Sequence, residues 1–261
     1  MKPGIKNISI IGAGNVAWHL GNAFAKAGIK INHIAGRDHD KTKQLAELLG
    51  SKSFGALEEE IPESDLYLLA VKDDVIRTVF EKIYKKGRFI VHLAGAIEGN
   101  ILAMHNNNYG VIWPMQTLTK NNDIDLQHTL IAVSGNSPEY QLMLKELASR
   151  ISSRVIEVSD GQRAIMHLSA VWINNYTNHM YDIAYNLLKE NNLSLELFYP
   201  LMEEHLTKIK EIAPDQLQTG PAIRGDMATL AKHKSMLNNH KDWKELYATL
   251  AKSILHKYIN K

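Results

Sequence analysis

The chain contains no cysteine, and this absence excludes several kinds of chemistry at once. Without a thiol it has no disulfide framework, no cysteine nucleophile and no zinc site built on cysteine ligands. The 12 histidines are scattered, and none has a metal-ligand spacing such as His-Glu-x-x-His. The motif Gly-x-Ser-x-Gly of many serine hydrolases is also missing. The sequence therefore argues against thiol, metal and serine-hydrolase catalysis.

Charge of one sign and long apolar runs are missing as well. The 261 residues include 30 basic and 28 acidic side chains, a net charge of +2, which leaves no basic footprint for nucleic acid. No apolar run reaches about 18 residues, and residues 1–9 contain no apolar signal core. Apolar and charged contents of 45% and 22% are typical of globular proteins. We expect a cytoplasmic protein of one large or two modest domains, without membrane or nucleic-acid partners.

What the chain does contain is a glycine-rich turn between a predicted strand and a predicted helix. An apolar strand over residues 8–11 leads into the pattern Gly-x-Gly-x-x-Ala, which ends at Ala17. The first glycine permits the tight turn, and the second lets a pyrophosphate approach the backbone. The N–H groups at the helix start attract phosphate. The turn predicts a dinucleotide site, with a purely structural turn as the alternative. Its predicted cofactor-binding residues are Gly12, Ala13, Gly14, Asn15 and Val16.

The end of the next predicted strand, over residues 29–35, indicates which dinucleotide binds. NAD-preferring folds usually place Asp or Glu there for the ribose hydroxyl, whereas this strand ends in Gly36-Arg37-Asp38. Gly36 has no carboxylate to repel a 2′-phosphate, and Arg37 offers a fork of donors that suits phosphate. We therefore expect NADP as the cofactor. Two alternatives stay open: Arg37 is a solvated charge while Asp38 caps the next helix, or Asp38 is itself the ribose ligand.

Strand-like and helix-like segments alternate up to residue 158, and strand signals stop after that point. The further predicted strands cover 65–71, 88–94, 109–113, 129–133 and 154–158, and the predicted helices between them cover 41–49, 74–84 and 138–151. This alternation predicts βαβ units and a mostly parallel sheet. We expect an α/β fold, with a doubly wound Rossmann domain over residues 1–158 and an all-helical C-terminal domain over 159–261.

The helical half begins with a long amphipathic helix over residues 165–188. Its apolar positions are spaced as on one helical face: Ile165, Leu168, Trp172, Tyr176, Ile183 and Leu187. The opposite face carries His167 and Asn174 among further amides. This polar stripe is either the wall of a cleft between the domains or a solvated face rich in asparagine.

Several motifs resemble one superfamily. GAGNVAWHLG at 12–21, the Ala-Gly-Arg turn at 35–37 and LLAVKDDVI at 68–76 resemble the NADP-binding domain of 6-phosphogluconate dehydrogenase-like proteins, which include pyrroline-5-carboxylate reductase and deazaflavin-dependent NADP reductase. The resemblance implies that Val71 and Lys72 pass over the cofactor ribose.

Other motifs resemble one branch of that superfamily more specifically. They are HLAGAI at 92–97, WPMQTL at 113–118, MHLSAVWINNYTNHM at 166–180 and QTGPAIRGD at 218–226. This branch consists of NADP oxidoreductases in which a helical domain of unknown function follows the Rossmann domain. Related folds commonly dimerise through their helical domains, and the resemblance therefore implies a homodimer.

The chain departs from the better-known superfamily members at residues that bear on catalysis. Those members often have Lys four residues before Asn on the helix after the Rossmann domain, and this chain has no such pair. Members of the branch often have His where this chain has Trp113. A proton donor must then be His167, His92 or a water. We favour His167, because imidazole titrates near neutrality.

The combined hypothesis is an NADP-dependent oxidoreductase that passes hydride between nicotinamide and the carbonyl or imine carbon of a small polar substrate. His167 donates the proton and Asn174 orients the substrate. Arg224, in the QTGPAIRGD turn, binds an anionic group of the substrate or is a plain solvated charge. A non-catalytic dinucleotide-binding sensor or partner-binding module is the alternative, which the missing lysine favours. Hydride transfer to a deazaflavin or flavin is a third possibility.

Overall fold

A computed structural model describes residues 4–51, 54–57, 59–104, 108–120 and 124–259. By its internal contacts the chain divides into two compact units, Met1–Ile173 and Asn174–Lys261. The division lies within the helical segment that follows the last strand, so the first unit includes the start of that segment.

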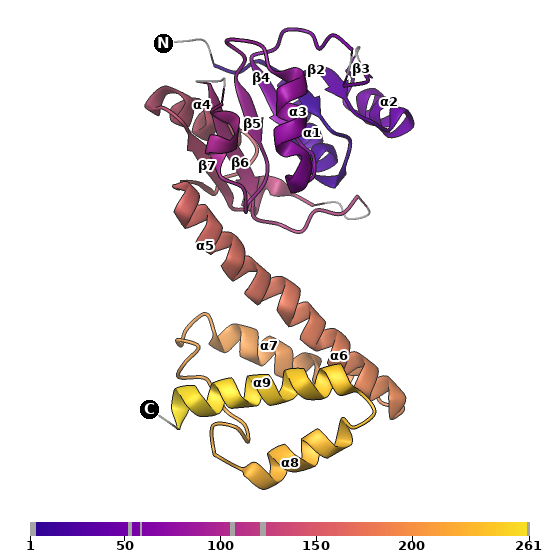
Figure 1. Ribbon diagram of the computed structural model, residues 1–261, viewed down its shortest axis with the longest axis vertical. Coiled ribbons are helices and arrows are strands. Elements are labelled where there is room, and N and C mark those ends of the chain that lie inside the picture. The colour runs from indigo at the N-terminus through magenta and orange to yellow at the C-terminus, as the bar shows by residue number, and fades with distance from the viewer. Residues whose placement is uncertain (1–3, 52–53, 58, 105–107, 121–123, 260–261) are drawn as a thin grey trace. The chain divides into compact units, whose positions relative to one another are not determined.

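The first unit is built on an eight-stranded sheet in the order β3-β2-β1-β4-β5-β6-β7-β8 (Figure 1). Its strands are β1 (Asn7–Ile11), β2 (Lys30–Ala35), β3 (Phe54–Gly55), β4 (Leu66–Leu69), β5 (Ile90–His92), β6 (Tyr109–Pro114), β7 (Ile131–Gly135) and β8 (Val155–Glu157). Across the described residues every strand pair is parallel except β6 with β7. The predicted doubly wound, mostly parallel sheet is confirmed.

Local signals in the sequence explain where the helices of this unit begin and end. They are α1 (Asn15–Lys26), α2 (His39–Leu48), α3 (Ile76–Ile83), α4 (Pro138–Ser149) and α5 (Asp160–Ala170). Gly28, with φ +80°, follows the end of α1, and the side chain of Ser137 caps α4 ahead of Pro138. Ser159 begins α5 with a capping box closed by Gln162.

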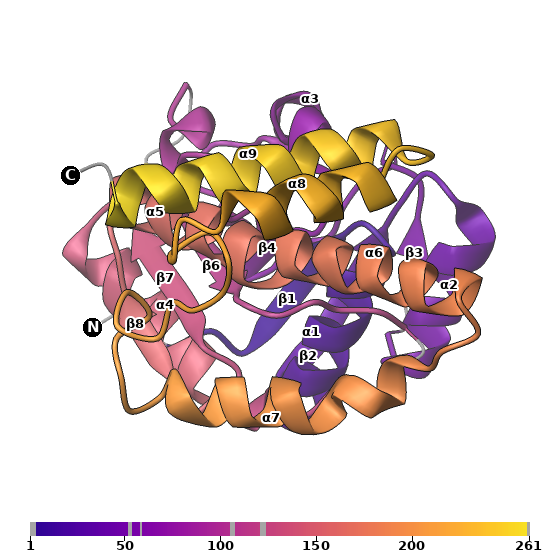
Figure 2. The ribbon, with the colours of Figure 1, turned by 90° about the horizontal axis from the view of Figure 1, so that it is seen from below.

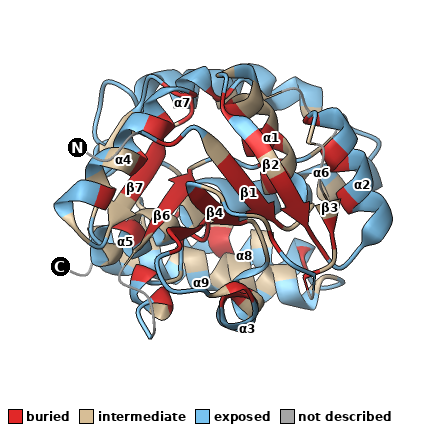
Figure 3. Cartoon of the chain, turned by 90° about the horizontal axis from the view of Figure 1, so that it is seen from above, coloured by how far each residue is buried: buried red, intermediate tan, exposed pale blue. Residues whose placement is uncertain are grey.

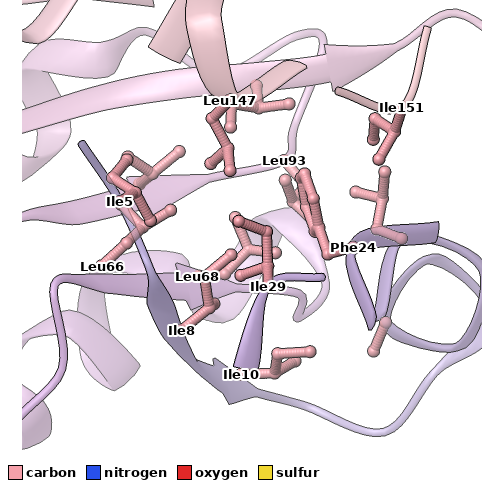
Figure 4. Close-up of a cluster of buried hydrophobic side chains, with 14 of the residues drawn as sticks. Ile5, Ile8, Ile10, Phe24, Ile29, Leu66, Leu68, Leu93, Leu147 and Ile151 are labelled. Carbon is pink, nitrogen blue, oxygen red and sulfur yellow. The ribbon is translucent and has the colours of Figure 1, made fainter. Parts of the chain in front are cut away.

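The core of the first unit has two sides, because successive side chains of a strand point to opposite faces of the sheet. Leu66 and Leu68 of β4 pack on one face, in the cluster drawn in Figure 4, whereas Tyr67 and Leu69 pack on the other. Figure 3 shows buried strands, and helices that are buried on their inner side and exposed on their outer side. Burial on both faces is typical of a parallel sheet covered by helices.

The second unit is helical, as predicted. A π-helical stretch, Val171–Tyr176, joins α5 to α6 (Thr177–Glu190), so the predicted long helix is present but is interrupted. The unit also contains α7 (Tyr199–Lys208), α8 (Met227–Met236) and α9 (Lys241–Tyr258). Helices α8 and α9 lie side by side (Figures 1 and 2), linked by a 2.8 Å hydrogen bond between His233 Nδ1 and the Tyr247 hydroxyl. No helix in the described part of the chain is long and apolar enough to cross a membrane.

Candidate functional site

A cavity of about 730 Å³ lies at the carboxyl edge of the sheet in the first unit. The loops after β1, β2 and β4 line it, together with one face of α3. After β1 the chain turns to β2 and β3 on one side of the sheet, and then crosses to β4 on the other side. The cavity therefore lies at a topological switch point, where open α/β sheets bind their ligands.

The structure explains the two glycines of the β1–α1 turn in different ways. Gly12 has φ +115°, and a Cβ there would lie 2.2 Å from the carbonyl oxygen of Ala70. Only glycine fits that position. A Cβ at Gly14 would meet nothing within 4 Å, so the space in front of Gly14 is open. The turn is thus closed behind Gly12 and open to a ligand at Gly14.

The start of α1 has the chemistry of an anion site. Gly14 is the N-cap residue, no side chain caps the helix, and its first turn has no acidic residue. The first N–H groups of a helix need an acceptor from outside the helix, and the helix dipole favours a negatively charged one. Asn15 and Val16 form the beginning of this turn, whereas Gly12, Ala13 and Gly14 line the cavity itself. These features fit the pyrophosphate of a dinucleotide.

The loop after β2 contributes Gly36, Arg37 and Asp38 to the same cavity. A Cβ at Gly36 would lie 2.4 Å from Thr42 Oγ1, so the side chain of Thr42 requires a glycine there. Asp38 is the N-cap of α2, with Oδ1 accepting from the Lys41 backbone N–H at 3.1 Å and Oδ2 lying 2.7 Å from Lys41 Nζ. These hydrogen bonds from the Lys41 ammonium and backbone lower the pKa of Asp38. The Asp38 carboxylate is thus engaged by its own helix.

The cavity lining is cationic. Among the described residues it includes four basic side chains and one carboxylate, that of Asp38. The basic residues are Arg37, Lys41, Lys72 and Lys82. Val71 and Lys72 come from the loop after β4, where the resemblance places them, whereas Lys82 of α3 was not anticipated. An excess of positive charge around a cavity of this size suits a ligand with several phosphate groups.

His167 lies at the same edge of the sheet, beside the ends of β5 and β6. Its ring centroid is 5.7 Å from that of Trp113, the last residue but one of β6. A Cβ at Gly95, in the loop after β5, would lie 2.7 Å from His167 Cδ2 and 2.6 Å from the indole of Trp113. Gly95 therefore allows the imidazole, the indole and the backbone to meet, and His167 is half-buried there.

The other two residues predicted for catalysis, Asn174 and Arg224, belong to the second unit, and both are exposed. Asn174 lies within the π-helical stretch. Because a π-helix pairs residues i and i+5, the 3.6-residue period that placed Asn174 on one stripe with His167 does not hold there. Arg224 lies in the turn before α8, two residues before Asp226, which caps that helix by accepting from the Thr229 N–H at 3.0 Å.

His92, the alternative proton donor, is fully buried. Burial, with a smaller effect from the Arg163 charge, lowers the pKa of His92 to about 4. Its Nδ1 accepts from the Ala94 N–H at 3.2 Å, and Nε2 faces the Glu98 carbonyl at 3.4 Å. His92 is therefore neutral near pH 7, with both nitrogens directed at the backbone, which is a poor state for a proton donor.

The network around Arg163, which stands four positions before His167, was not predicted from the sequence. The guanidinium is buried and pairs with the carboxylate of Asp160 at 2.7 Å. It also donates to Ser134 Oγ at 3.0 Å and to the carbonyl of Ile97. An arginine in an otherwise amphipathic helix is a weak signal, because most such arginines are solvated. In the described ranges no group of His, Asp and Glu is arranged to hold a metal ion.

Two family models match the chain. Residues 7–95 match the family described as NADP oxidoreductase, coenzyme F420-dependent, and residues 129–254 match a domain of unknown function, DUF2520. None of the curated proteins compared with the chain matches it.

Solved structures resemble the chain over almost its whole length. A Bacteroides fragilis protein, provisionally described as an NADP oxidoreductase, is 34% identical over 97% of this chain and 98% of its own, with a TM-score of 0.87. The 1-pyrroline-5-carboxylate reductase of Streptococcus pyogenes is 18% identical over 95% of this chain and 98% of its own, with a TM-score of 0.61. A variant imine reductase of Myxococcus stipitatus, in complex with NAD+, is 15% identical over 99% of this chain and 100% of its own, with a TM-score of 0.69. The reductases of S. pyogenes and M. stipitatus share the fold of this chain.

Proposed function

The chain belongs to the NADP oxidoreductase family, and from this we propose that it transfers hydride between NADP and the carbonyl or imine carbon of a small polar substrate. The nicotinamide supplies or accepts the hydride when the cofactor is bound. The residues of this chain hold the two reactants together and move a proton.

One observation carries the proposal: the cationic cavity at the switch point, with open space at Gly14 and an uncapped α1. We assign the pyrophosphate to the Gly12–Gly14 turn and to the N–H groups around Asn15 and Val16. Val71 and Lys72 border the neighbouring part of the dinucleotide. In this assignment backbone N–H groups bind the pyrophosphate, and the turn keeps the conformation that it has in the structure.

We assign the 2′-phosphate of the adenosine ribose to Gly36 and Arg37. No carboxylate of the described residues pairs with Arg37, so its guanidinium is available to phosphate. An NAD-type contact would need the carboxylate of Asp38, which already accepts from the Lys41 N–H and pairs with its ammonium group. The imine reductase that shares this fold is in complex with NAD+, so the affinities of this chain for NADPH and NADH should be compared directly.

His167 is our choice for the proton donor. With the adenosine side of the dinucleotide at β2, the nicotinamide side is that of β4 and β5, and His167 stands against the loop after β5. Its imidazole would give a proton to the oxygen or nitrogen that gains charge as hydride arrives. Asn174 would orient the substrate and Arg224 would bind its anionic group. Several fold neighbours are named as imine reductases, which supports a carbon–nitrogen double bond as one substrate class.

The direct test offers the purified protein NADPH that carries deuterium at nicotinamide C4, with a panel of cyclic imines and small carbonyl compounds. The expected result is deuterium on the carbon of one reduced product, measured by mass spectrometry. A separate arm offers a deazaflavin and a flavin as hydride acceptors. Tight NADPH binding with no transfer in any arm would contradict the proposal and favour a dinucleotide sensor.

A further inference from the structure

Arg163 of α5 is a charged side chain in a place where charge is costly. Among the described residues it is the largest of the fully buried side chains, with 1% of its surface exposed. Removing a guanidinium from water is strongly unfavourable unless hydrogen bonds and an opposite charge compensate. The partners that compensate Arg163 therefore show what it holds in place.

These partners come from three segments of the first unit. The Nη1 of Arg163 donates to Asp160 in the first turn of α5 and to Ser134 of β7, and Nη2 donates to the Ile97 carbonyl. The same Asp160 carboxylate accepts from the Gly99 N–H at 2.9 Å. Ile97 and Gly99 belong to the loop after β5, so the pair of Arg163 and Asp160 holds that loop at two points.

The same loop carries Gly95, against which His167 packs. His167 follows Arg163 by four residues, so both side chains leave one face of α5. A Cβ at Gly95 would lie within 2.7 Å of both the imidazole and the Trp113 indole. The loop, the helix and the two rings thus fit together only in a narrow range of positions, and a small displacement of the loop would move the imidazole.

We propose that Arg163 is a positioning residue for His167. By holding residues 97–99 against α5, its guanidinium keeps the Gly95 backbone and the Trp113 indole in contact with the imidazole. The functional part of this inference rests on the proposed role of His167 as proton donor, whereas the placement of the imidazole does not depend on it.

A matched control lies at the opposite end of β5. Arg88 is also buried, with 5% of its surface exposed, and its Nη1 and Nη2 donate to the carbonyls of Ile83 at 2.7 Å and Ile61 at 2.8 Å. Arg88 precedes β5, whereas the loop held by Arg163 follows it. Both arginines bind backbone carbonyls in the core, but only Arg163 lies beside His167.

The test compares Arg163→Met with Arg88→Met by NMR of the histidine imidazole protons, with the His167 signal assigned through His167→Gln. Both variants should lower the melting temperature. Only Arg163→Met should remove the ring-current shift that the Trp113 indole imposes on His167. With an active substrate, kcat of Arg163→Met should fall by up to about 10²-fold, because misplacing a reacting group by about 1 Å can cost that much.

Where Arg163→Met does not fold, Ser134→Ala carries the measurement, because it removes one contact of the guanidinium and leaves the charge pair intact. If the His167 signal keeps the chemical shift of the unmodified protein in folded Arg163→Met or Ser134→Ala, the proposal is overturned. A displaced signal with unchanged turnover supports the positioning role and refutes His167 as the proton donor. The two hypotheses therefore fail by different observations.

Discussion

The first unit buries the apolar side chains of its strands, whereas the second unit buries few of its large apolar side chains and leaves many of them exposed. Ile8, Ile10 and Leu68 in the sheet have no exposed surface. Among the described residues of the second unit, three apolar side chains are buried: Ala222, Leu230 and Leu237. Leu197, Leu201 and Leu206, by contrast, expose 67%, 61% and 59% of their surface.

This difference shows that the two units have different sources of stability. Burying apolar surface is the main favourable term in folding, at roughly 25 cal/mol per Å². The first unit obtains this term from its own sheet and helices. A large amount of exposed apolar surface on a helical unit is typical of a region that another molecule covers. We propose that a second copy of the chain covers it, in a homodimer.

The oligomeric state is the most direct test of this difference between the two units. Light scattering should give the mass of two chains at micromolar concentration. Leu201→Glu, on α7, should give the mass of one chain, because it places an unpaired charge in the proposed contact. Leu142→Glu is the matched control, since Leu142 is an exposed leucine of the first unit, on α4. It should stay dimeric. A single-chain mass for the unmodified protein would contradict the homodimer.

The same contrast explains how much could be predicted from the sequence. Glycines, caps and apolar runs act over a few residues, and they located α1, β2 and the dinucleotide turn from the sequence alone. The two-residue β3 has too short a signal, and the antiparallel pairing of β6 with β7 depends on contacts distant in sequence. The π-helical stretch breaks the very period used to predict that helix.

The candidate site divides in the same way. The residues predicted to bind a dinucleotide follow one another in short motifs, and most of them meet around one cavity. The surroundings of His167 depend instead on distant partners. Arg163 reaches Ser134 and Ile97 across 29 and 66 residues of chain. Local patterns therefore predicted residues that line one cavity, whereas only the folded chain shows the contacts of His167.

If the first unit holds the cofactor, one substitution there should abolish binding without unfolding the chain. Gly14→Val places a branched side chain in the open space before α1, where nothing lies within 4 Å. We expect no NADPH binding by calorimetry and a nearly unchanged melting temperature. Gly12→Val is the contrast, because its Cβ would strike the carbonyl of Ala70 and should destabilise the fold itself. Retained NADPH binding in Gly14→Val would mean that the turn is only structural.

His167 belongs to the first unit and Asn174 to the second, so substituting each one compares what the two units contribute to catalysis. General acid catalysis typically contributes about 10²–10⁴-fold, so His167→Ala should lower kcat by about that range, with little change in NADPH affinity. Asn174→Ala should raise KM for the substrate more than it lowers kcat. Steady-state kinetics with the substrate found by deuterium transfer provides the measurement. Equal kcat for His167→Ala and the unmodified enzyme would leave water as the donor.

The buried core of the first unit should also make its stability depend on pH through His92. The folded-state pKa of His92, about 4, lies below the ordinary histidine pKa of about 6.5, so the unfolded chain binds more protons between these values. The free energy of unfolding should therefore decrease as the pH falls from 6.5 to 4, by on the order of 3 kcal/mol. Denaturant titrations at several pH values measure this, and His92→Asn should flatten the dependence. An equally steep dependence in His92→Asn would assign the effect to other groups.

The smallest expected effect concerns the choice of dinucleotide. Arg37 and Lys41 border the position assigned to the 2′-phosphate, and the carboxylate of Asp38 is engaged by Lys41. NADPH should therefore bind at least about tenfold more tightly than NADH, which corresponds to about 1.4 kcal/mol. Arg37→Ala should remove most of this ratio by weakening NADPH binding alone, because NADH has no 2′-phosphate to lose.

Lys82→Ala, from the α3 side of the same cavity, is the matched control for a general loss of positive charge. It should weaken both dinucleotides to a similar extent. Equal affinities for NADPH and NADH in the unmodified protein, measured by calorimetry, would overturn the assignment of Arg37 and return Asp38 to the position of ribose ligand.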